Sequence, residues 1–177
     1  MKTEASDFKQ VLRARARALS RISEPPAVAQ TFLELLEFRV AQESYALENR
    51  YVQEVCPFKE LTPLPCTPPF VLGIVNIRGR ILPVLDLKKF FDLPEVGLTD
   101  LHRIILVQGN GLELGLLADV IVGVRSVPAD CLQPSLPTLG GIRSDYLKGV
   151  TAERLVVLDL ARILADPRII VHEEVEA

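Results

Sequence analysis

The sequence predicts a mainly all-β fold made of two similar units, each with about five short strands. The first observation behind this prediction is that short apolar segments recur along the chain, separated by turns rich in glycine, proline and asparagine. The second is that the same order of elements occurs twice. A unit of about five short strands rarely folds alone, and we therefore expect the two units to share a core. Short strands with frequent turns favour closed or partly closed barrels.

The composition limits the class of protein. Hydrophobic residues make up 49% of the 177 residues, which suits one domain, or two small ones that share a core. The net charge of -3 gives no sign of nucleic-acid binding, and no apolar run approaches the roughly 18 residues of a membrane span. The three cysteines and two histidines lack the spacing of a metal site or a disulfide framework. We therefore expect a cytoplasmic protein with no metal, no cofactor and no direct membrane insertion.

The two ends of the chain differ in charge from the rest. Residues 1–30 carry six Lys or Arg and three Asp or Glu, and are expected to form a basic helix and a linker. The helix, over residues 6–21, either contacts a partner or an anionic membrane surface, or is a solvated helix packed loosely on the body. Residues 167–177 form an acidic tail that we expect to be mobile.

After the linker, the sequence predicts a strand over residues 32–40 and a second strand from Tyr45 onwards. Residues 49–55 either continue as a strand or form one helical turn. In this segment we expect Val52 and Val55 to face inward, because both are apolar.

A proline-rich connection leads from these strands to a hairpin. The cysteines on either side of it, Cys56 and Cys66, are interpreted as small apolar fillers. The hairpin combines two apolar runs, residues 70–77 and 81–87, around a tight turn at Arg78-Gly79-Arg80. It is predicted to be a rigid element that displays charge.

The elements after this hairpin complete the first unit and build the second. Asp86 is placed to cap a short helix over residues 87–91. The remaining expected elements are strands over residues 102–107, 112–117, 120–127, 146–150 and 154–160, a hairpin turn at 108–111 and a short closing helix or turn at 161–165.

The sequence repeats itself in two places. Residues 45–55 align without a gap to residues 114–124, and residues 70–87 align to residues 146–160. The second copy of the hairpin is three residues shorter, at the position of the Arg-Gly turn. A turn that served only as scaffold would be expected in both copies, so its loss from one copy indicates a further role in the other.

The aspartates at the strand ends, Asp86 and Asp159, are interpreted as helix N-caps rather than catalytic carboxylates, because neither has a second carboxylate or a lysine cluster nearby in sequence. His102 has no indicated serine or cysteine partner. The sequence therefore predicts a protein that is not an enzyme.

Glu54 and Arg78 are charges within otherwise apolar segments of the first unit. If the units close as barrels, these segments become neighbours and the two charges pair. The pair is either an ordinary surface ion pair, worth about 0–1 kcal/mol, or a device that presents oriented charge to a partner.

The hairpin carries a recognisable pattern. The residues Gly73-x-x-Asn76-x-Arg78-Gly79-x-x-x-Pro83-Val84-x-Asp86-Leu87 closely resemble the signature of the CheW-like domain. Residues 45–55, the loop 61–65 and residues 116–119 and 146–160 are also similar to this family's pattern. The resemblance covers about residues 31–166.

The resemblance implies two intertwined five-stranded SH3-like β-barrel subdomains around a common core. One would span about residues 45–100, and the other about residues 31–44 and 101–166. It further implies a scaffold or adaptor that joins methyl-accepting chemotaxis receptors to the histidine kinase CheA, in the cytoplasm at membrane-bound receptor arrays. Alternatives are a competitor for the receptor site and an adaptor of a parallel pilus or gliding-motility pathway.

The resemblance also assigns a protein-binding site. Receptor tips would dock between the subdomains, and the regulatory domain of CheA would dock on the first. Residues matching Glu54 and Arg78 form a salt bridge in the family that is important for control of the kinase. The same interaction region includes the positions of Val52, Gly73, Asn76 and Gly79, some of them for structural reasons.

Overall fold

The computed structural model describes residues 31–94, 101–134 and 142–169. The expected basic helix and the acidic tail beyond residue 169 lie outside the described residues. No helix in the described ranges is long and apolar enough to span a membrane. The strands are β1 (Phe32–Val40), β2 (Glu43–Glu48), β3 (Val52–Pro57), β4 (Val71–Ile77), β5 (Arg80–Asp86), β6 (Arg103–Gly109), β7 (Leu112–Ala118), β8 (Val120–Pro128), β9 (Leu147–Val150) and β10 (Val156–Leu158).

Short helical segments connect these strands. Residues 49–55, for which the sequence allowed a strand or a helical turn, contain both, because a 3-10 turn precedes β3. The helices are α2 (Leu87–Phe90) and α3 (Leu160–Leu164), with 3-10 turns η1 (Asn49–Tyr51), η2 (Ala129–Cys131) and η3 (Ile142–Tyr146).

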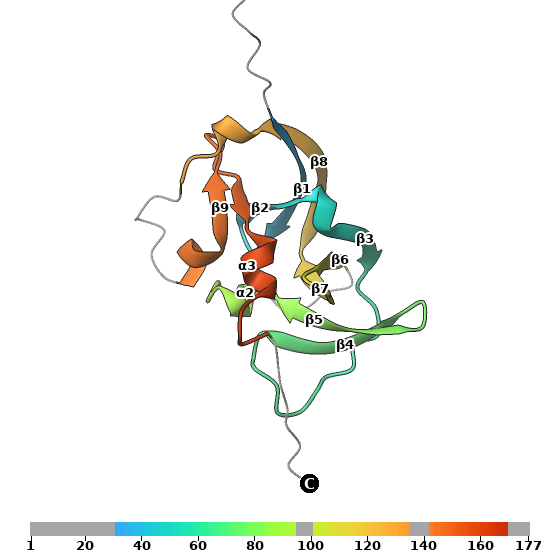
Figure 1. The fold of residues 1–177 in the computed structure, drawn as a ribbon. Helices are drawn as coiled ribbons and strands as arrows, with labels where there is room; N and C mark the ends of the chain where they lie inside the picture. Colours follow the sequence, from blue (N-terminus) through green and yellow to red (C-terminus); the bar gives the residue numbers. More distant parts are fainter. Residues whose placement is uncertain (1–30, 95–100, 135–141, 170–177) are drawn as a thin grey trace, which may run out of the picture. The chain divides into compact units, whose positions relative to one another are not determined.

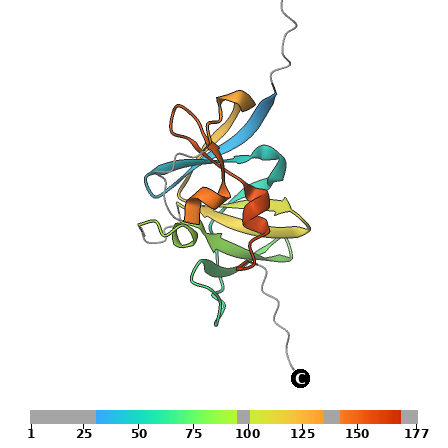
Figure 2. The same cartoon turned by 60° about the vertical axis from the view of Figure 1, so that its left-hand side comes forward.

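The strands form two five-stranded sheets, which confirms the predicted fold class. The sheet with the order β3-β6-β7-β5-β4 is called the first subdomain, and the sheet with the order β8-β1-β2-β10-β9 the second subdomain. In two views the second lies above the first (Figures 1 and 2). The halves of the chain exchange strands: β1 and β2 pair with strands of the second half, and β6 and β7 complete the sheet of β3, β4 and β5. The ranges expected from the sequence place β2 in the first subdomain and β6 and β7 in the second, whereas the structure has these strands the other way round.

The internal repeat is reproduced in the register of the sheets. In the first subdomain the parallel pair of β5 and β7 sets Val84 opposite Gly115. In the second, the parallel pair of β10 and β2 sets Val157 opposite Ala46. These are matching positions of the two sequence copies, so each half repeats the same supersecondary unit down to single residues.

The helix caps repeat in the same way. The Asp86 side chain accepts a hydrogen bond from the Lys88 N–H, and the Asp159 side chain accepts one from the Arg162 N–H. Each aspartate also donates its backbone N–H across 2.8 Å, Asp86 to the Phe70 carbonyl and Asp159 to the Tyr146 carbonyl. The predicted role of both aspartates as N-caps is confirmed.

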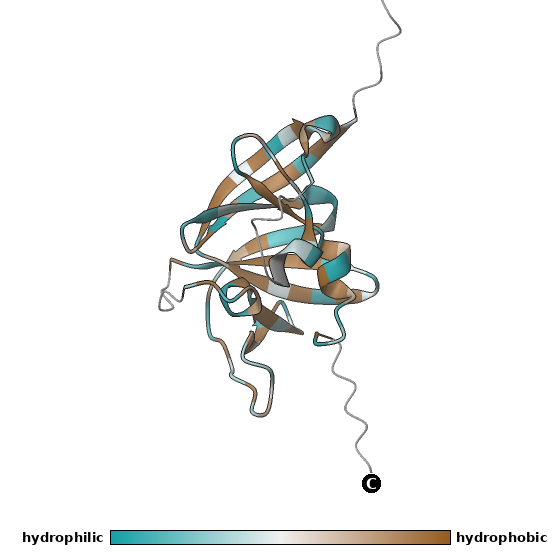
Figure 3. Ribbon diagram, turned by 90° about the vertical axis from the view of Figure 1, so that its left-hand side faces the viewer, coloured by the Kyte–Doolittle hydropathy of each residue, from teal (hydrophilic) through white to brown (hydrophobic). Residues whose placement is uncertain are grey.

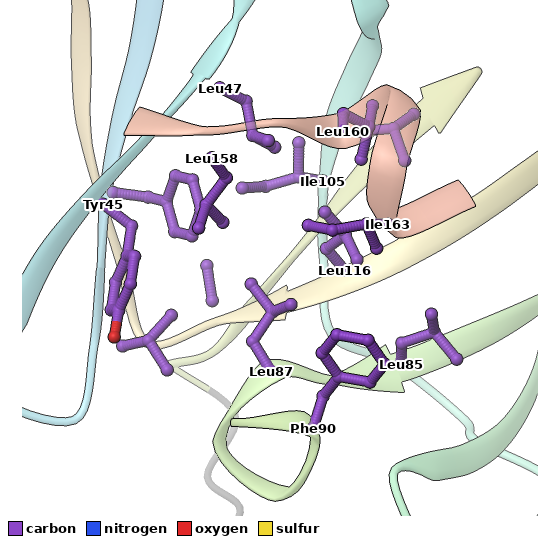
Figure 4. Packing of buried hydrophobic residues seen from close by; sticks show 14 of the residues in the cluster. Tyr45, Leu47, Leu85, Leu87, Phe90, Ile105, Leu116, Leu158, Leu160 and Ile163 are labelled. Atoms are coloured by element: carbon purple, nitrogen blue, oxygen red, sulfur yellow. The ribbon is translucent and has the colours of Figure 1, made fainter. Parts of the chain in front are cut away.

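A large apolar core lies between the two sheets, and each sheet also encloses a smaller cluster of its own. Strand β6 shows the reason: Ile104 and Leu106 point into the cluster of the first subdomain, while Ile105 and Val107 point into the shared core. Along other strands hydrophobic and hydrophilic residues alternate (Figure 3). Figure 4 shows the shared core, to which Tyr45 contributes from β2. Neither sheet could bury this surface without the other.

The two hairpins related by the repeat differ in length. Strands β4 and β5 have seven residues each, and their turn projects from the body (Figure 1). Strands β9 and β10 have four and three residues. Their connection folds back on itself, with the Thr151 N–H donating to the Leu155 carbonyl at 3.0 Å and Leu155 buried. The projecting end is thus a feature of the first subdomain that its counterpart lacks.

Candidate protein-interaction site

The turn between β4 and β5 is tightly specified. Arg78 and Gly79 have φ angles of 52° and 83°, and the flanking residues Ile77 and Arg80 pair with each other. Two consecutive residues with positive φ are typical of a type I′ turn, whose twist matches that of a hairpin. The Asn76 side-chain oxygen accepts a hydrogen bond of 2.9 Å from the Gly79 N–H. This arrangement explains Asn76 and Gly79 as residues that hold Arg78 in place.

Arg78 pairs with Glu54 on β3. The Glu54 Oε2 lies 2.8 Å from the Arg78 Nη2, and the side chains are 22% and 79% exposed, respectively. Glu54 occupies an inward-facing position of β3, so its carboxylate is largely shielded from solvent while the guanidinium of Arg78 is exposed. The pairing expected from the sequence is therefore confirmed, and its role in binding is taken up below.

Two other expected site residues, Val52 and Gly73, lie where they support the fold. Val52 is half-buried against the shared core. Gly73 has a φ of +147°, and a Cβ there would lie 2.2 Å from the Thr62 carbonyl oxygen. The inward orientation predicted for Val55 is wrong, since Val55 is 39% exposed. Successive side chains of a strand point to opposite faces, and in β3 Glu54 takes the inward position.

The two cysteines near the proline-rich connection differ. Cys56 packs in the cluster of the first subdomain, as expected for a filler. Burial raises the pKa of its thiol and the negative charge of Glu54 raises that pKa further, against a smaller lowering by the charge of Arg78. Cys66 is exposed, which corrects its interpretation as a buried filler. Its loop position, where prolines prevent regular packing, accounts for the difference.

The turn carries a second ion pair that sequence reasoning did not predict. The Arg80 Nη1 lies 3.0 Å from both carboxylate oxygens of Glu113 on β7. Next to it, Ile81 is 66% exposed. The only local signal was the symmetry of Arg78-Gly79-Arg80, because nothing in the sequence of β7 marks Glu113 as a partner.

A buried polar cluster lies where the chain passes from β7 to β8. Asp119 Oδ1 is 2.6 Å from the Lys88 Nζ and 2.8 Å from the His102 Nε2. Its Oδ2 accepts a hydrogen bond of 2.7 Å from the Ala41 N–H. The carboxylate thus links the β1–β2 turn, α2 and the start of β6, which is the arrangement of a structural joint rather than of a catalytic dyad. Among the described residues, no group of three or more His, Cys, Asp or Glu could hold a metal ion.

These features define a two-subdomain β protein whose candidate site is an exposed, preorganised surface for contact with another protein. The chain belongs to the family of the CheW-like domain, whose model matches residues 34–168.

Similar proteins agree with this assignment. The chain is 29% identical over 148 residues to the chemotaxis protein CheW of Treponema pallidum, a match that covers 80% of this chain and 87% of that protein. It is 32% identical over 148 residues to the protein FrzA of Myxococcus xanthus, covering 80% and 91% of the two chains. A crystal structure of the scaffolding protein TtCheW from Thermoanaerobacter tengcongensis matches with a TM-score of 0.66 and 30% identity, over 76% of this chain and 88% of that chain.

Proposed function

We propose that this protein is a scaffold that couples methyl-accepting chemotaxis receptors to the histidine kinase CheA. The observation that carries the proposal is the Glu54–Arg78 pair at the projecting turn of a CheW-like fold. An ion pair this exposed contributes little to stability, about 0–1 kcal/mol. The fixed orientation of Arg78 is therefore better explained by contact with a partner protein.

The regulatory domain of CheA is the partner that we assign to the first subdomain. An adaptor also needs a second contact surface. The strand β8, at one end of the other sheet, exposes Val120, Val122 and Val124 by 52%, 51% and 59%. A row of exposed apolar side chains on one strand face is typical of a protein contact, so we assign the receptor to this face rather than to the position between the subdomains that the resemblance implies.

The mechanism is a shift of populations rather than a chemical step. The protein holds receptor and kinase in one geometry, and a change of receptor conformation then alters the balance between active and inactive kinase. This work would take place in the cytoplasm, next to membrane-bound receptor arrays. The receptors and kinase that bind decide whether the pathway is flagellar chemotaxis or a parallel pilus or gliding-motility system.

The test is reconstitution with purified cognate components. Binding of the protein to receptor fragments and to CheA is measured separately, followed by kinase autophosphorylation in the ternary mixture. A scaffold binds both and makes the kinase responsive to receptor. Binding of the receptor alone, without any effect on the kinase, would identify a competitor for the receptor site. Failure to bind either component would refute the scaffold.

A further inference from the structure

A charged network lies where the chain leaves α3 and runs to the start of β4 (Figure 1). The Arg168 Nη2 and Nε lie 2.8 Å and 3.1 Å from the Oδ2 of Asp166. The Tyr146 hydroxyl, at the end of η3, donates to Asp166 and accepts a hydrogen bond of 3.1 Å from the Arg168 Nη2. The side chain of Asp166 is 3% exposed and that of Arg168 is 41% exposed. Three side chains of the second half of the chain thus form one closed network.

The same guanidinium also covers the first half of the chain. The central carbon of the Arg168 guanidinium lies 4.6 Å from the centre of the Phe90 ring on α2. It lies 5.8 Å from the ring centre of Phe70, the residue before β4. The rings of Phe90 and Tyr146 contact each other, with 5.2 Å between their centres. Arg168 is therefore hydrogen-bonded to the second half and stacked on the first, where both pack into the shared core.

The internal repeat indicates that folding of such a unit does not require this network. Asp166 is the seventh residue after the helix cap Asp159, and the seventh residue after the cap Asp86 is Leu93. Both are buried, at 5% and 6% exposure. One copy thus buries a leucine where the other buries a carboxylate. Since replacement of a buried ion pair by apolar side chains is often neutral or stabilising, the network needs an explanation other than stability alone.

The network and the shared core differ in what they fix. The core joins the two sheets by burial of apolar surface, which is a non-directional interaction. Hydrogen bonds depend on angle, and a satisfied buried network rigidifies its surroundings. Because the guanidinium is a planar fork, rotation of one sheet against the other would break its bonds to Asp166 or move it off the Phe90 ring. Arg168 therefore opposes changes of angle that the apolar core alone permits.

We propose that Arg168 is a positioning residue that holds the two subdomains at one angle and thereby keeps the kinase-binding and receptor-binding surfaces in a fixed relation. This inference rests on the proposed function, because it names the device by which one scaffold transmits a change of receptor conformation to the kinase. The partners of Arg168 named above belong to neither of the two binding surfaces. Loss of Arg168 should therefore uncouple the two surfaces while each still binds its own partner.

The first measurement follows the geometry of the full-length protein without any partner. Cys66 lies in the loop between β3 and β4, and Cys131 ends η2 after β8, so the two thiols belong to different subdomains. Both are exposed. With Cys56 replaced by alanine, spin labels on these two thiols report the distance between the subdomains by double electron–electron resonance. The width of the distance distribution measures how tightly the angle is fixed.

The variants separate orientation from folding. Arg168→Ala removes the guanidinium, and Asp166→Leu introduces the residue type that the other copy buries. The matched control is Arg162→Ala, because Arg162 pairs with Asp159 and donates to the Asp145 carbonyl, both in the second half of the chain. Unfolding curves are recorded for each variant. Binding of receptor fragments and of the CheA regulatory domain is then measured separately, followed by kinase autophosphorylation in the ternary mixture.

We expect Arg168→Ala and Asp166→Leu to widen the distance distribution at least twofold and to reduce receptor control of the kinase several-fold. Each separate affinity should stay within threefold of the wild type, and Arg162→Ala should match the wild type throughout. An unchanged distance distribution or normal coupling in either folded variant would overturn the inference. So would a loss of separate binding as large as the loss of coupling, because it would show a structural role only. If the wild type binds neither partner, the proposed function fails, while the distance measurement still decides whether Arg168 fixes the angle.

Discussion

The carboxylate of Glu54 lies 2.8 Å from the guanidinium of Arg78, and the two residues belong to opposite ends of one sheet. Glu54 is on β3 and Arg78 follows β4, the first and last strands in the order of the first subdomain. The ion pair therefore bridges the two terminal strands of the sheet, which have no ladder hydrogen bonds with each other.

Replacement of Arg78 separates binding from stability. We expect Arg78→Ala to lower the free energy of unfolding by about 1 kcal/mol or less, because an exposed ion pair contributes little. Receptor control of kinase autophosphorylation should fall much more. Arg162→Ala, which removes another exposed paired arginine, serves as the control. A large drop in melting temperature together with normal coupling of the folded protein would show that Arg78 is only structural.

Much of this site could be predicted because its signals are local. The turn at Arg78-Gly79, the capping by Asp86 and the repeat of both hairpins all depend on residues close together in sequence. The pairing of Glu54 with Arg78 required one further expectation, that the two ends of the unit approach each other, and the ion pair confirms it.

Other features depend on contacts that no local pattern indicates. The repeat shows that the two halves are alike, but not that β6 and β7 complete the sheet of the first half. Arg80 and Glu113 meet because β5 and β7 lie side by side as parallel strands, a consequence of that exchange. The orientation of Val55 failed for a different reason, because apolar character was given more weight than the alternation of a strand.

Gly73 and Gly79 both have a positive φ, but they differ in the space available for a side chain. At Gly73 a Cβ would lie 2.2 Å from a backbone oxygen of the loop at Thr62, and the φ of +147° is unfavourable for other residues. At Gly79, where φ is +83°, nothing lies within 4 Å. We expect Gly73→Ala to cost roughly 2–5 kcal/mol of unfolding free energy, and Gly79→Ala only about 1–2 kcal/mol. Urea denaturation checks this order, and equal losses would contradict the close approach.

The two helix caps allow a comparison within one molecule. Asp86 is buried and caps α2 inside the core, whereas the side chain of Asp159 is 28% exposed at the start of α3. We expect Asp86→Ala to cost about 2 kcal/mol and Asp159→Ala about 1 kcal/mol or less. Asp86→Asn, which keeps a capping oxygen, should recover most of the loss. Thermal unfolding of the three variants measures the order, and a larger effect at Asp159 would refute it.

Asp166 makes stability depend on pH in acid. Hydrogen bonds from the Arg168 guanidinium hold the pKa of Asp166 at about 2, below its ordinary value of 3.8. The Tyr146 hydroxyl also donates to this carboxylate. Because the pKa is lowered in the folded state, the stabilisation is complete above about pH 4 and is lost as the pH falls toward 2; it amounts to about 2 kcal/mol.

Arg168→Ala should remove most of this pH dependence. It also removes a guanidinium that lies 4.6 Å from the centre of the Phe90 ring. The free energy of unfolding is compared at pH 7 and pH 3 for the wild type, Arg168→Ala and the control Arg162→Ala, whose partner Asp159 is more exposed. The free energy of unfolding should change less between pH 7 and pH 3 for Arg168→Ala than for the other two proteins. An equal change in all three would contradict the role of Arg168.

The buried pair of Lys88 and Asp119 should respond asymmetrically to substitution. Lys88 is 2% exposed, so Asp119→Asn leaves its ammonium buried without a counter-charge, which we expect to cost about 3–5 kcal/mol. Lys88→Met removes that charge and keeps most of the packing. Asp119 is 20% exposed and retains the His102 imidazole and the Ala41 N–H, so this loss should be about 1 kcal/mol.

The double variant is the decisive measurement. In the double variant Lys88→Met/Asp119→Asn both charges are absent, so no ammonium is left buried without a counter-charge. This double variant should therefore be more stable than Asp119→Asn alone. Urea denaturation of the two single variants and the double variant gives the coupling energy. Additive losses would show that Asp119 acts mainly through the Ala41 N–H and His102, and that the joint between the two sheets does not depend on its pairing with Lys88.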